Sequence, residues 1–296
     1  MTHIPVLQKE VLEYLGPKQN DNFIDCTIGE AGHSLAILEK TAPKGKILGI
    51  EWDIELFKKL EKECLKWQIK QRLILVNGSY ANLEEIVKRE NFKPVSGILF
   101  DLGMSSWHLK ESKRGFSFLG KEPLDMRYNL ENPLTAEKLL NYWSRGEIEK
   151  ILREFGEENF SKKISEKIIE MRKIKPIKDT LQLVEIIKRA VPNRYLHQKI
   201  NPATRTFQAL RIAVNNELKN LQEVLPQTLE VLERGGRLAI ISFHSLEDRI
   251  VKNFLREQAK NNLLKILTKK PIVPTDEEIK INPRSRSAKL RAAQLN

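Results

Sequence analysis

The feature that most constrains the fold is a regular alternation of short apolar runs with charged segments over residues 23–101. Four runs are mostly apolar: 23–26, 46–50, 73–76 and 97–100. The segments 54–66 and 81–90 place apolar residues at helical spacing. Apolar strands that alternate with helices are typical of a parallel sheet covered on both faces. The sequence therefore predicts a doubly wound α/β sheet.

The alternation stops after Asp101 and resumes with the apolar run 237–242. The chain between them contains four helical segments and no strand-like run: 136–142, 145–155, 158–172 and 180–190. Insertions are tolerated in the loops at the edge of a sheet. We therefore expect an all-helical domain, 108–205, inserted in a sheet domain that consists of 1–107 and 206–296.

The positive charge of the chain is concentrated in two segments. Lys and Arg number 51 and Asp and Glu 39, which gives a net charge of +12. Segment 162–205 holds 12 basic and 4 acidic side chains, and segment 280–296 holds 5 basic and no acidic ones. Concentrated positive charge favours a polyanion partner. We expect both segments to hold phosphates, although a merely soluble, lysine-rich surface is the alternative.

Several protein classes are excluded by composition. No apolar run approaches the roughly 18 residues of a membrane helix. The start of the chain has no basic segment followed by an apolar one, so no secretory signal is expected and the location should be cytoplasmic. Two cysteines, Cys26 and Cys64, cannot form a disulfide framework. No His, Cys, Asp or Glu cluster has ligand spacing, so we expect no metal.

A glycine-containing turn follows the first predicted strand. Gly29 and Gly32 allow the backbone to approach a ligand, and the next helix adds unpaired N–H donors. The second strand ends at Glu51, where an acid bonds ribose hydroxyls in dinucleotide folds. The GxxG spacing lacks the pyrophosphate-binding turn of GxGxxG, which favours an adenosyl ligand over NAD. Asp25 would then bind the ligand's ammonium group, whereas a turn needed only for packing is the alternative.

Polar residues also follow the other predicted strands, whose carboxyl ends share one edge of the sheet. Tyr80, after the third strand, is placed to stack on adenine, or else is a core tyrosine. Asp101 ends the fourth strand and is followed by Ser105 and Ser106. His244 follows the run 237–242 and is a candidate for catalysis or substrate contact.

Two features near these residues have structural alternatives. Ser245 with Asp248 fits a helix-capping box, which does not account for His244. The runs 114–127 and 203–215 mix arginine with aromatic and amide side chains, a composition that holds phosphates and stacks unpaired bases. Helix packing and local ion pairs are the alternative for both runs.

Taken together, these motifs resemble the bacterial ribosomal RNA small subunit methyltransferase H family. The shared motifs follow one another along nearly the whole chain: His3–Leu7, Asp25–Gly29, Gly32–Ser34, Asp101–Gly103, Ser105–Ser106, Arg114–Phe118, Pro123–Arg127, Gly156–Glu158, Ala203–Gln208, Ser242–Arg249, Asn282–Arg284 and Ser287–Ala288. The resemblance implies a class I, Rossmann-like methyltransferase sheet with an inserted helical domain. It also implies S-adenosyl-L-methionine as cofactor and N4-methylation of a cytidine in the decoding region of 16S rRNA, within the small ribosomal subunit.

The resemblance also implies particular site residues. Cofactor contacts carry over to seven positions: Ala31, Gly32, His33, Glu51, Tyr80, Asp101 and His108. Four of them differ from the family pattern, which has glycine, aspartate, phenylalanine and glutamine at Ala31, Glu51, Tyr80 and His108. Because Glu51 keeps a carboxylate and Ala31 an N–H, we expect the same class of ligand.

The group that accepts a hydrogen bond from the cytosine amino group is not fixed by the motifs. The candidates for this acceptor are, in order of preference, Asp101, then Ser105 or Ser106, and then His244. Two other functions stay open: methylation of another RNA base, and a catalytically inactive ribosome-assembly factor that binds rRNA. An NAD-dependent dehydrogenase is disfavoured by the missing diphosphate fingerprint.

Overall fold

The computed structural model describes residues 5–67, 69, 71–197 and 201–296, and the chain divides into two compact units. The sheet unit comprises Met1–Ser105 and Leu218–Asn296, and the helical unit comprises Ser106–Glu217. A boundary at residue 205 would cut helix α11 (Thr204–Asn215), which lies wholly in the helical unit. Of the His3–Leu7 motif, His3 and Ile4 lie outside the described residues.

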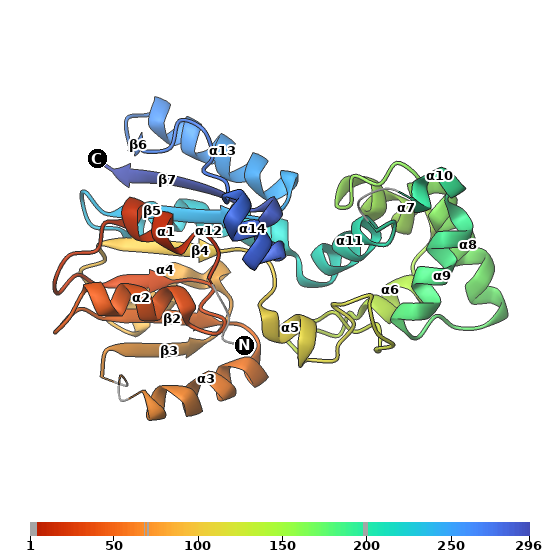
Figure 1. Cartoon of the computed structure of the whole chain (residues 1–296), viewed down its shortest axis with the longest axis horizontal. Coiled ribbons are helices and arrows are strands. Elements are labelled where there is room, and N and C mark those ends of the chain that lie inside the picture. The colour runs from red at the N-terminus through yellow and green to blue at the C-terminus, as the bar shows by residue number, and fades with distance from the viewer. Residues whose placement is uncertain (1–4, 68, 70, 198–200) are drawn as a thin grey trace. The chain divides into compact units, whose positions relative to one another are not determined.

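The sheet unit is built on one seven-stranded sheet (Figure 1). Its order is β3-β2-β1-β4-β5-β7-β6, with β1 to β5 parallel and β7 antiparallel to both neighbours. The predicted strands are confirmed to within a residue or two, as β1 (Phe23–Asp25), β2 (Ile47–Glu51), β3 (Leu73–Asn77), β4 (Gly97–Asp101) and β5 (Arg237–Ser242). The strand order reverses between β1 and β4, the point at which doubly wound sheets bind ligands.

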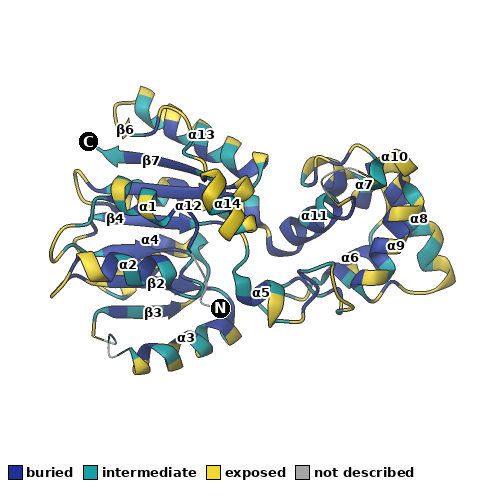
Figure 2. Ribbon diagram, in the orientation of Figure 1, coloured by how far each residue is buried: buried dark blue, intermediate teal, exposed yellow. Residues whose placement is uncertain are grey.

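Helices cover both faces of this sheet, as the sequence predicts. Buried side chains of α1 (Gln8–Leu15), α2 (Gly32–Lys40) and α3 (Ile54–Lys66) form one core against the strands. Those of α4 (Leu83–Arg89), α12 (Glu217–Val231) and α13 (Ser245–Lys260) form the other. The central strands are buried, shown dark blue in Figure 2. The expected α/β fold class is therefore confirmed.

Strands β6 (Leu264–Ile266) and β7 (Lys289–Leu295) were not predicted, and they change the interpretation of the basic C-terminal segment. Arg291 donates two hydrogen bonds to the Asp248 carboxylate, at 2.6 and 3.2 Å, and Lys289 Nζ lies 3.6 Å from it. Arg291 lowers the pKa of Asp248 against the effect of burial. The protein itself therefore uses the guanidinium of Arg291, and phosphate binding by the rest of the segment stays a prediction. Between the strands lie α14 (Asp276–Ile281) and a 3₁₀ turn, Pro283–Ser287.

We expect Arg291→Met to lower the free energy of unfolding by about 2 kcal/mol, because it leaves the half-buried Asp248 carboxylate without its bidentate partner. The loss should be complete at neutral pH and shrink as the pH falls below about 4 towards the lowered pKa of folded Asp248, because the carboxylate then becomes protonated in the folded state as well. Urea titration measures both effects. Lys289→Gln is the control and should cost under about 0.5 kcal/mol, since that side chain is 39% exposed. Equal losses of stability in the two variants would contradict the conclusion that Arg291 is the main partner of Asp248.

The regular elements of the helical unit, within its described residues, are all helices. They are α5 (Ser106–Lys110), α6 (Ala136–Tyr142), α7 (Arg145–Glu154), α8 (Ser161–Ile174), α9 (Thr180–Ala190), α10 (Asn193–Leu196) and α11. Capping boxes begin α7, from Ser144 to Glu147, and α9, from Asp179 to Gln182. In neither unit do the described residues include a helix of the length and apolar character needed to cross a membrane.

Candidate functional site

The loop between β1 and α2 is braced by the buried carboxylate of Asp25. Asp25 Oδ1 accepts the N–H of Thr27 at 3.2 Å, and Oδ2 accepts the Ser34 hydroxyl at 2.7 Å. Burial raises the pKa of Asp25 to about 6, although both hydrogen bonds favour the ionised form. The residue is 2% exposed, and its carboxylate makes these two hydrogen bonds inside the loop; the ligand-ammonium role of Asp25 stays a prediction.

Residues Gly29 to Gly32 form the turn that leads into α2. Gly29 has a φ of 52° and Ala31 a φ of 62°, both in the left-handed region that costs a non-glycine residue about 1 kcal/mol. The Ala31 N–H donates to Ile28 O at 2.7 Å, so it serves the turn itself. A Cβ on Gly32 would collide with the ring of Pro5. Only glycine at position 32 allows this close packing.

Glu51 ties the same turn to the end of β2. Its Oε1 accepts the N–H of Asp53 at 2.8 Å, and the backbone N–H groups of Gly29 and Trp52 also hydrogen-bond to its carboxylate. The residue is 8% exposed, and burial raises its pKa to about 8, with the nearby charge of Asp53 acting in the same direction. The structure thus brings together the glycine turn and the acid that the sequence placed at one sheet edge.

Asp101 ends β4 next to this turn. Its backbone N–H donates to Thr27 Oγ1 at 2.6 Å, and its Oδ2 lies 3.7 Å from Nε2 of the buried His33. Its Oδ1 is buried and has no hydrogen-bond partner among the described residues. Burial raises the pKa of Asp101 to about 8, and the negative charges of Asp25 and Glu247 add to the effect. Asp101 therefore offers an acceptor atom that the protein leaves unused.

The remaining predicted residues divide between the two units. Ser105 lies beside the glycine turn, since an ideal Cβ on Gly29 would be 3.6 Å from Ser105 Cβ. Tyr80 is half-buried and meets the ring of Phe100 edge-on, with ring centroids 5.7 Å apart. Ser106 and His108 belong to the helical unit.

His108 is 4% exposed and packs among aromatic rings of the helical unit. Its ring centroid lies 5.1 Å from that of Phe116 and 4.9 Å from that of Tyr128, and the latter two rings stack on each other. Within its own unit, His108 is thus part of an aromatic cluster that no single sequence motif indicated.

The segment after β5 corrects the expected helix cap. His244 caps α13 with Glu247 as the third residue, one position earlier than the predicted pair Ser245 and Asp248. The Glu247 N–H donates to His244 Nδ1 at 3.4 Å, and His244 Nε2 lies 3.1 Å from Glu247 Oε1. The cap lies one residue earlier than expected because the Asp248 carboxylate accepts hydrogen bonds from Arg291 instead of capping the helix. His244 Nδ1 is used in this cap, whereas its buried Nε2 has no hydrogen-bond partner among the described residues, so a catalytic or substrate-contact role for His244 stays a prediction.

Glu247 is the site residue that the sequence reasoning missed. It is 3% exposed, and its Oε2 accepts the N–H groups of Phe243 at 2.8 Å and His244 at 3.3 Å. Its charge also raises the pKa of Asp101. The signal in the sequence was an acid three residues after His244, but histidine is not among the common N-cap residues.

A family model described as the MraW methylase family matches residues 1–296. The chain belongs to this family. A ribosomal RNA small subunit methyltransferase H from Heliobacterium mobile is 46% identical over 99% of this chain and 98% of its own length. The enzyme of that name from Thermotoga neapolitana is 48% identical over 99% and 96%. A solved rRNA methylase from Streptococcus thermophilus covers 99% of both chains with 10% identity and a TM-score of 0.45.

Membership of the MraW methylase family confirms S-adenosyl-L-methionine as the cofactor and a class I methyltransferase sheet as the fold. The chemistry of the site fits that cofactor, which carries a sulfonium and an ammonium group. Asp101 Oδ1 is a buried acceptor that no described residue uses. Glu51 and Asp101 both gain from a positive or hydrogen-donating ligand, because burial disfavours their ionised forms.

The arginines of the runs 114–127 and 203–215 make several contacts inside the helical unit. Arg114 Nη1 donates to Arg127 O at 2.7 Å, and its guanidinium lies over the ring of Trp107. Arg127 pairs with Asp125 at 2.7 Å, and the buried Arg211 makes two hydrogen bonds of 2.9 Å to Glu217. The packing alternative therefore holds for these three arginines.

Proposed function

We propose that this protein methylates N4 of a cytidine in the decoding region of 16S rRNA, within the small ribosomal subunit. The curated relatives are named as methyltransferases of small-subunit ribosomal RNA, which supports the class of substrate. The observation that carries an amino group as the target is the buried Oδ1 of Asp101, an acceptor without a partner among the described residues. An exocyclic N–H is the kind of donor that such an atom recognises.

S-adenosyl-L-methionine supplies an electrophilic methyl group when it is bound. The lone pair of cytosine N4 is delocalised into the ring, so the amino group is a weak nucleophile. An acceptor that takes a hydrogen bond from one N–H helps to turn the lone pair out of conjugation. We assign this role to Asp101, which also takes the proton that N4 loses once its new bond to carbon has formed.

Asp101 is suited to this role because its charge responds to the ligand. Without a ligand, burial and the neighbouring Asp25 and Glu247 favour its protonated form. A nearby cation favours the carboxylate, which is the form that accepts hydrogen bonds. We assign to Glu51 the hydrogen bonds with the ribose hydroxyls of the cofactor and to Tyr80 the contact with its adenine ring. Ser105 makes a secondary contact with the cytosine amino group.

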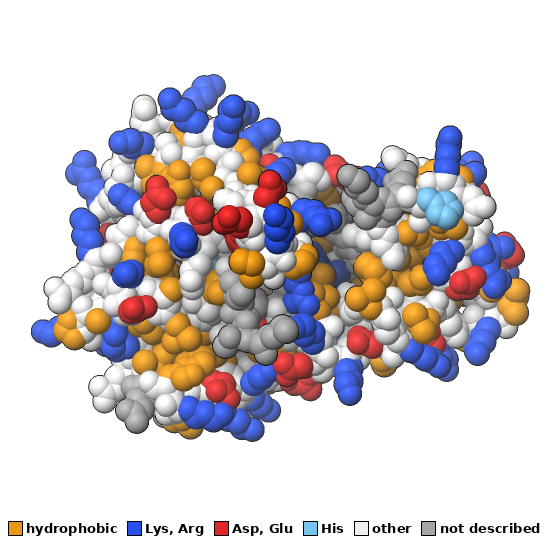
Figure 3. Space-filling view, in the orientation of Figure 1, with side chains coloured by type: hydrophobic (Ala, Val, Ile, Leu, Met, Phe, Trp, Pro, Cys, Tyr) orange, Lys and Arg blue, Asp and Glu red, His pale blue; other side chains and the backbone are white. Residues whose placement is uncertain are grey.

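The target base must leave its stack to reach this edge of the sheet, which is easiest in a single-stranded segment. We assign the RNA phosphates to exposed lysines of the helical unit. Lys173, Lys175 and Lys178 are exposed and form no ion pair with any residue that the structure describes. Figure 3 shows blue basic side chains among orange apolar ones over the surface of that unit.

We expect the triple variant Lys173→Gln, Lys175→Gln and Lys178→Gln to reduce RNA affinity and to flatten its dependence on salt. Each lost phosphate contact removes about 0.7 to 0.9 from the slope of log K against log salt, so the loss of three contacts should reduce the slope by about 2 to 3. Fluorescence anisotropy over a salt series measures this. A control triple of exposed lysines in the sheet unit, Lys44, Lys58 and Lys62, has the same change in charge and should bind as the parent does. Equal slopes in both triples would remove the helical unit from the RNA interface.

Nucleoside mass spectrometry of 16S rRNA from a deletion strain tests the proposal as a whole. Loss of 4-methylcytidine, restored by the parent gene and not by an Asp101→Asn variant, is the expected result. Loss of a different methylated nucleoside would instead show that another base is the target of methylation. An unchanged profile together with a defect in subunit assembly would favour the inactive rRNA-binding factor.

A further inference from the structure

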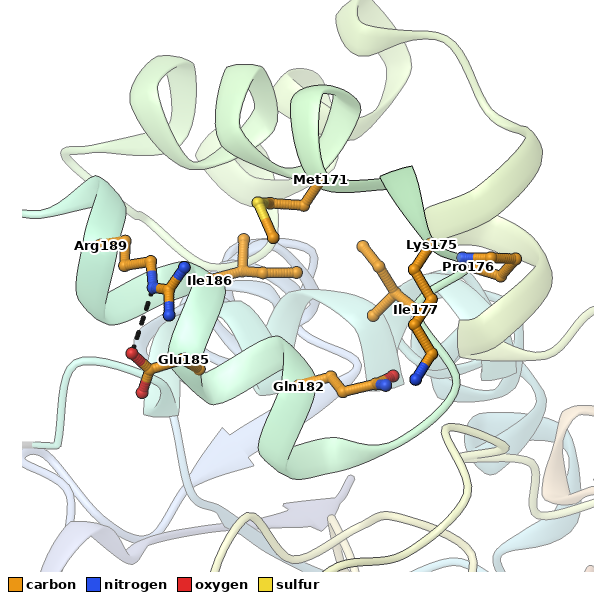
Figure 4. Close-up of a pocket in the computed structure, with 8 residues that line it drawn as sticks. All are labelled: Met171, Lys175, Pro176, Ile177, Gln182, Glu185, Ile186 and Arg189. Atoms are coloured by element: carbon orange, nitrogen blue, oxygen red, sulfur yellow. Dashed lines mark hydrogen bonds and ion pairs between the residues drawn. The ribbon is translucent and has the colours of Figure 1, made fainter. Parts of the chain in front are cut away.

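A pocket lies between α8 and α9 of the helical unit (Figure 4). Its floor is apolar and comes from three elements: Met171 on α8, Ile177 on the connection and Ile186 on α9. Asn141 fixes the connection by donating to Ile177 O at 2.8 Å and accepting from Ile177 N at 3.0 Å. The pocket therefore has a preformed apolar surface.

One polar group of the pocket has a fixed orientation. Gln182 Oε1 accepts the backbone N–H of Lys178 at 2.8 Å and that of Asp179 at 3.3 Å, as part of the cap of α9. These bonds determine which end of the amide is the oxygen. The Nε2 donor of Gln182 is left without an acceptor among the described residues, and the side chain lines the pocket.

Two cations stand at the rim. Lys175 is exposed and makes no ion pair within the described part of the chain. Arg189 uses its Nε to bond Glu185 at 3.2 Å, but both side chains are more than half exposed, so the pair is weak. Its planar guanidinium remains suited to a phosphate.

We propose that this pocket binds one unstacked nucleobase of the RNA substrate, with the adjoining phosphates held by Lys175 and Arg189. The proposal rests on the proposed function in taking RNA as the ligand. Charge complementarity favours this occupant, because segment 162–205 has 12 basic and 4 acidic side chains. A base offers an apolar face to Met171 and Ile186 and carbonyl oxygens to Gln182 Nε2. An apolar protein side chain would use the floor and make no use of the two cations at the rim.

A pocket-filling substitution tests the nucleobase without altering charge. Met171→Trp should weaken binding of a protein-free RNA fragment of the decoding region by about tenfold, the contribution of one base contact. Ile174→Trp is the matched control, because Ile174 is 75% exposed on the same helix and does not line the pocket; it should change affinity less than twofold. Circular dichroism and calorimetry with S-adenosylmethionine establish that both variants fold.

A second pair of variants tests the rim and covers the case in which Met171→Trp fails to fold. Lys175→Gln with Arg189→Gln should lower RNA affinity several-fold more than Lys162→Gln with Lys163→Gln. The control pair removes the same charge from exposed positions of α8 outside the pocket. Equal effects of the two pairs of substitutions on RNA affinity would show that Lys175 and Arg189 do not hold phosphates at the rim.

The outcomes separate this proposal from the proposed function. If Met171→Trp binds RNA as the parent does while 4-methylcytidine formation is intact, the pocket proposal fails and the function stands. If the variant loses RNA affinity but the parent makes no 4-methylcytidine, the function fails and the pocket stands. Unchanged binding to protein-free RNA with weaker binding to assembled small subunits would assign the pocket to a protein side chain and overturn the nucleobase.

Discussion

Asp101→Asn is expected to lower kcat for methyl transfer to 16S rRNA by about 10² to 10⁴-fold, the range of a lost proton-accepting group. The amide has nearly the same shape as the carboxylate, but it cannot take the proton from N4. Transfer of a labelled methyl group to small subunits from a deletion strain measures kcat and KM. Because the effect falls on a step after RNA binding, KM for the RNA should change little.

Loss of folding is not expected to account for this result. The pKa of Asp101 is raised to about 8, so its ionisation is unfavourable in the folded protein. Removal of that carboxyl should therefore leave stability at pH 8 unchanged or higher. Asp276→Asn, at an exposed position of α14, is the control for the loss of one acid. Activity of Asp101→Asn within threefold of the parent would eliminate Asp101 as the proton acceptor.

Affinity for S-adenosylmethionine is expected to rise between pH 6 and pH 8, by up to about tenfold per pH unit for each proton released. The pKa values of Asp25, Glu51 and Asp101 are raised to about 6, 8 and 8, so the ligand-free protein holds protons in this range. A cationic ligand favours their ionised forms and expels protons on binding. Calorimetry in buffers of different ionisation enthalpy counts the protons.

Two comparisons identify the groups that release these protons. S-adenosylhomocysteine lacks the sulfonium charge and should show a shallower rise. Glu51→Gln should weaken S-adenosylmethionine binding by tenfold or more, because a neutral amide replaces the charged acceptor of two hydroxyls, and should flatten the profile. An affinity that is independent of pH in the parent would show that the three carboxyls are not coupled to the ligand.

The same pKa values set the direction of the effect on stability without ligand. A raised carboxyl pKa means that the folded state binds more protons than the unfolded state above about pH 4. The stability that these extra bound protons provide is fully present below the ordinary pKa values of the carboxyls, and it is lost as the pH rises through 6 and 8. The free protein should therefore become less stable over the range in which it binds the cofactor more tightly.

The parallel part of the fold was predictable from sequence because buried parallel strands are nearly continuous apolar runs. The helices of the inserted unit were predictable from their periodicity, and 136–142 and 180–190 match α6 and α9 in full. Strand β7 was not, because its sequence Lys-Leu-Arg-Ala-Ala-Gln-Leu has two small residues at its centre and a buried arginine. The buried arginine pairs with Asp248, a partner 43 residues away that no local pattern indicates.

The candidate site was predictable in position and less so in the role of each residue. Parallel strands end at one edge, so Glu51 and Asp101 were expected to lie near the glycine turn whatever their hydrogen bonds. Periodicity and spacing do not show that Asp25 braces the turn through Ser34 or that His244 faces Glu247. Nor could spacing separate a buried arginine such as Arg211 from one that contacts RNA.

The antiparallel position of β7 has a consequence for biosynthesis. Six residues of β5 pair with β7, yet β7 is the last of the seven strands to emerge from the ribosome during translation. Until then one border of the nascent sheet exposes unpaired N–H and C=O groups, the kind of surface that associates with other chains. A stalled or truncated translation product that lacks 289–295 should therefore be a target of chaperones and proteases even though most of its core has already been synthesised.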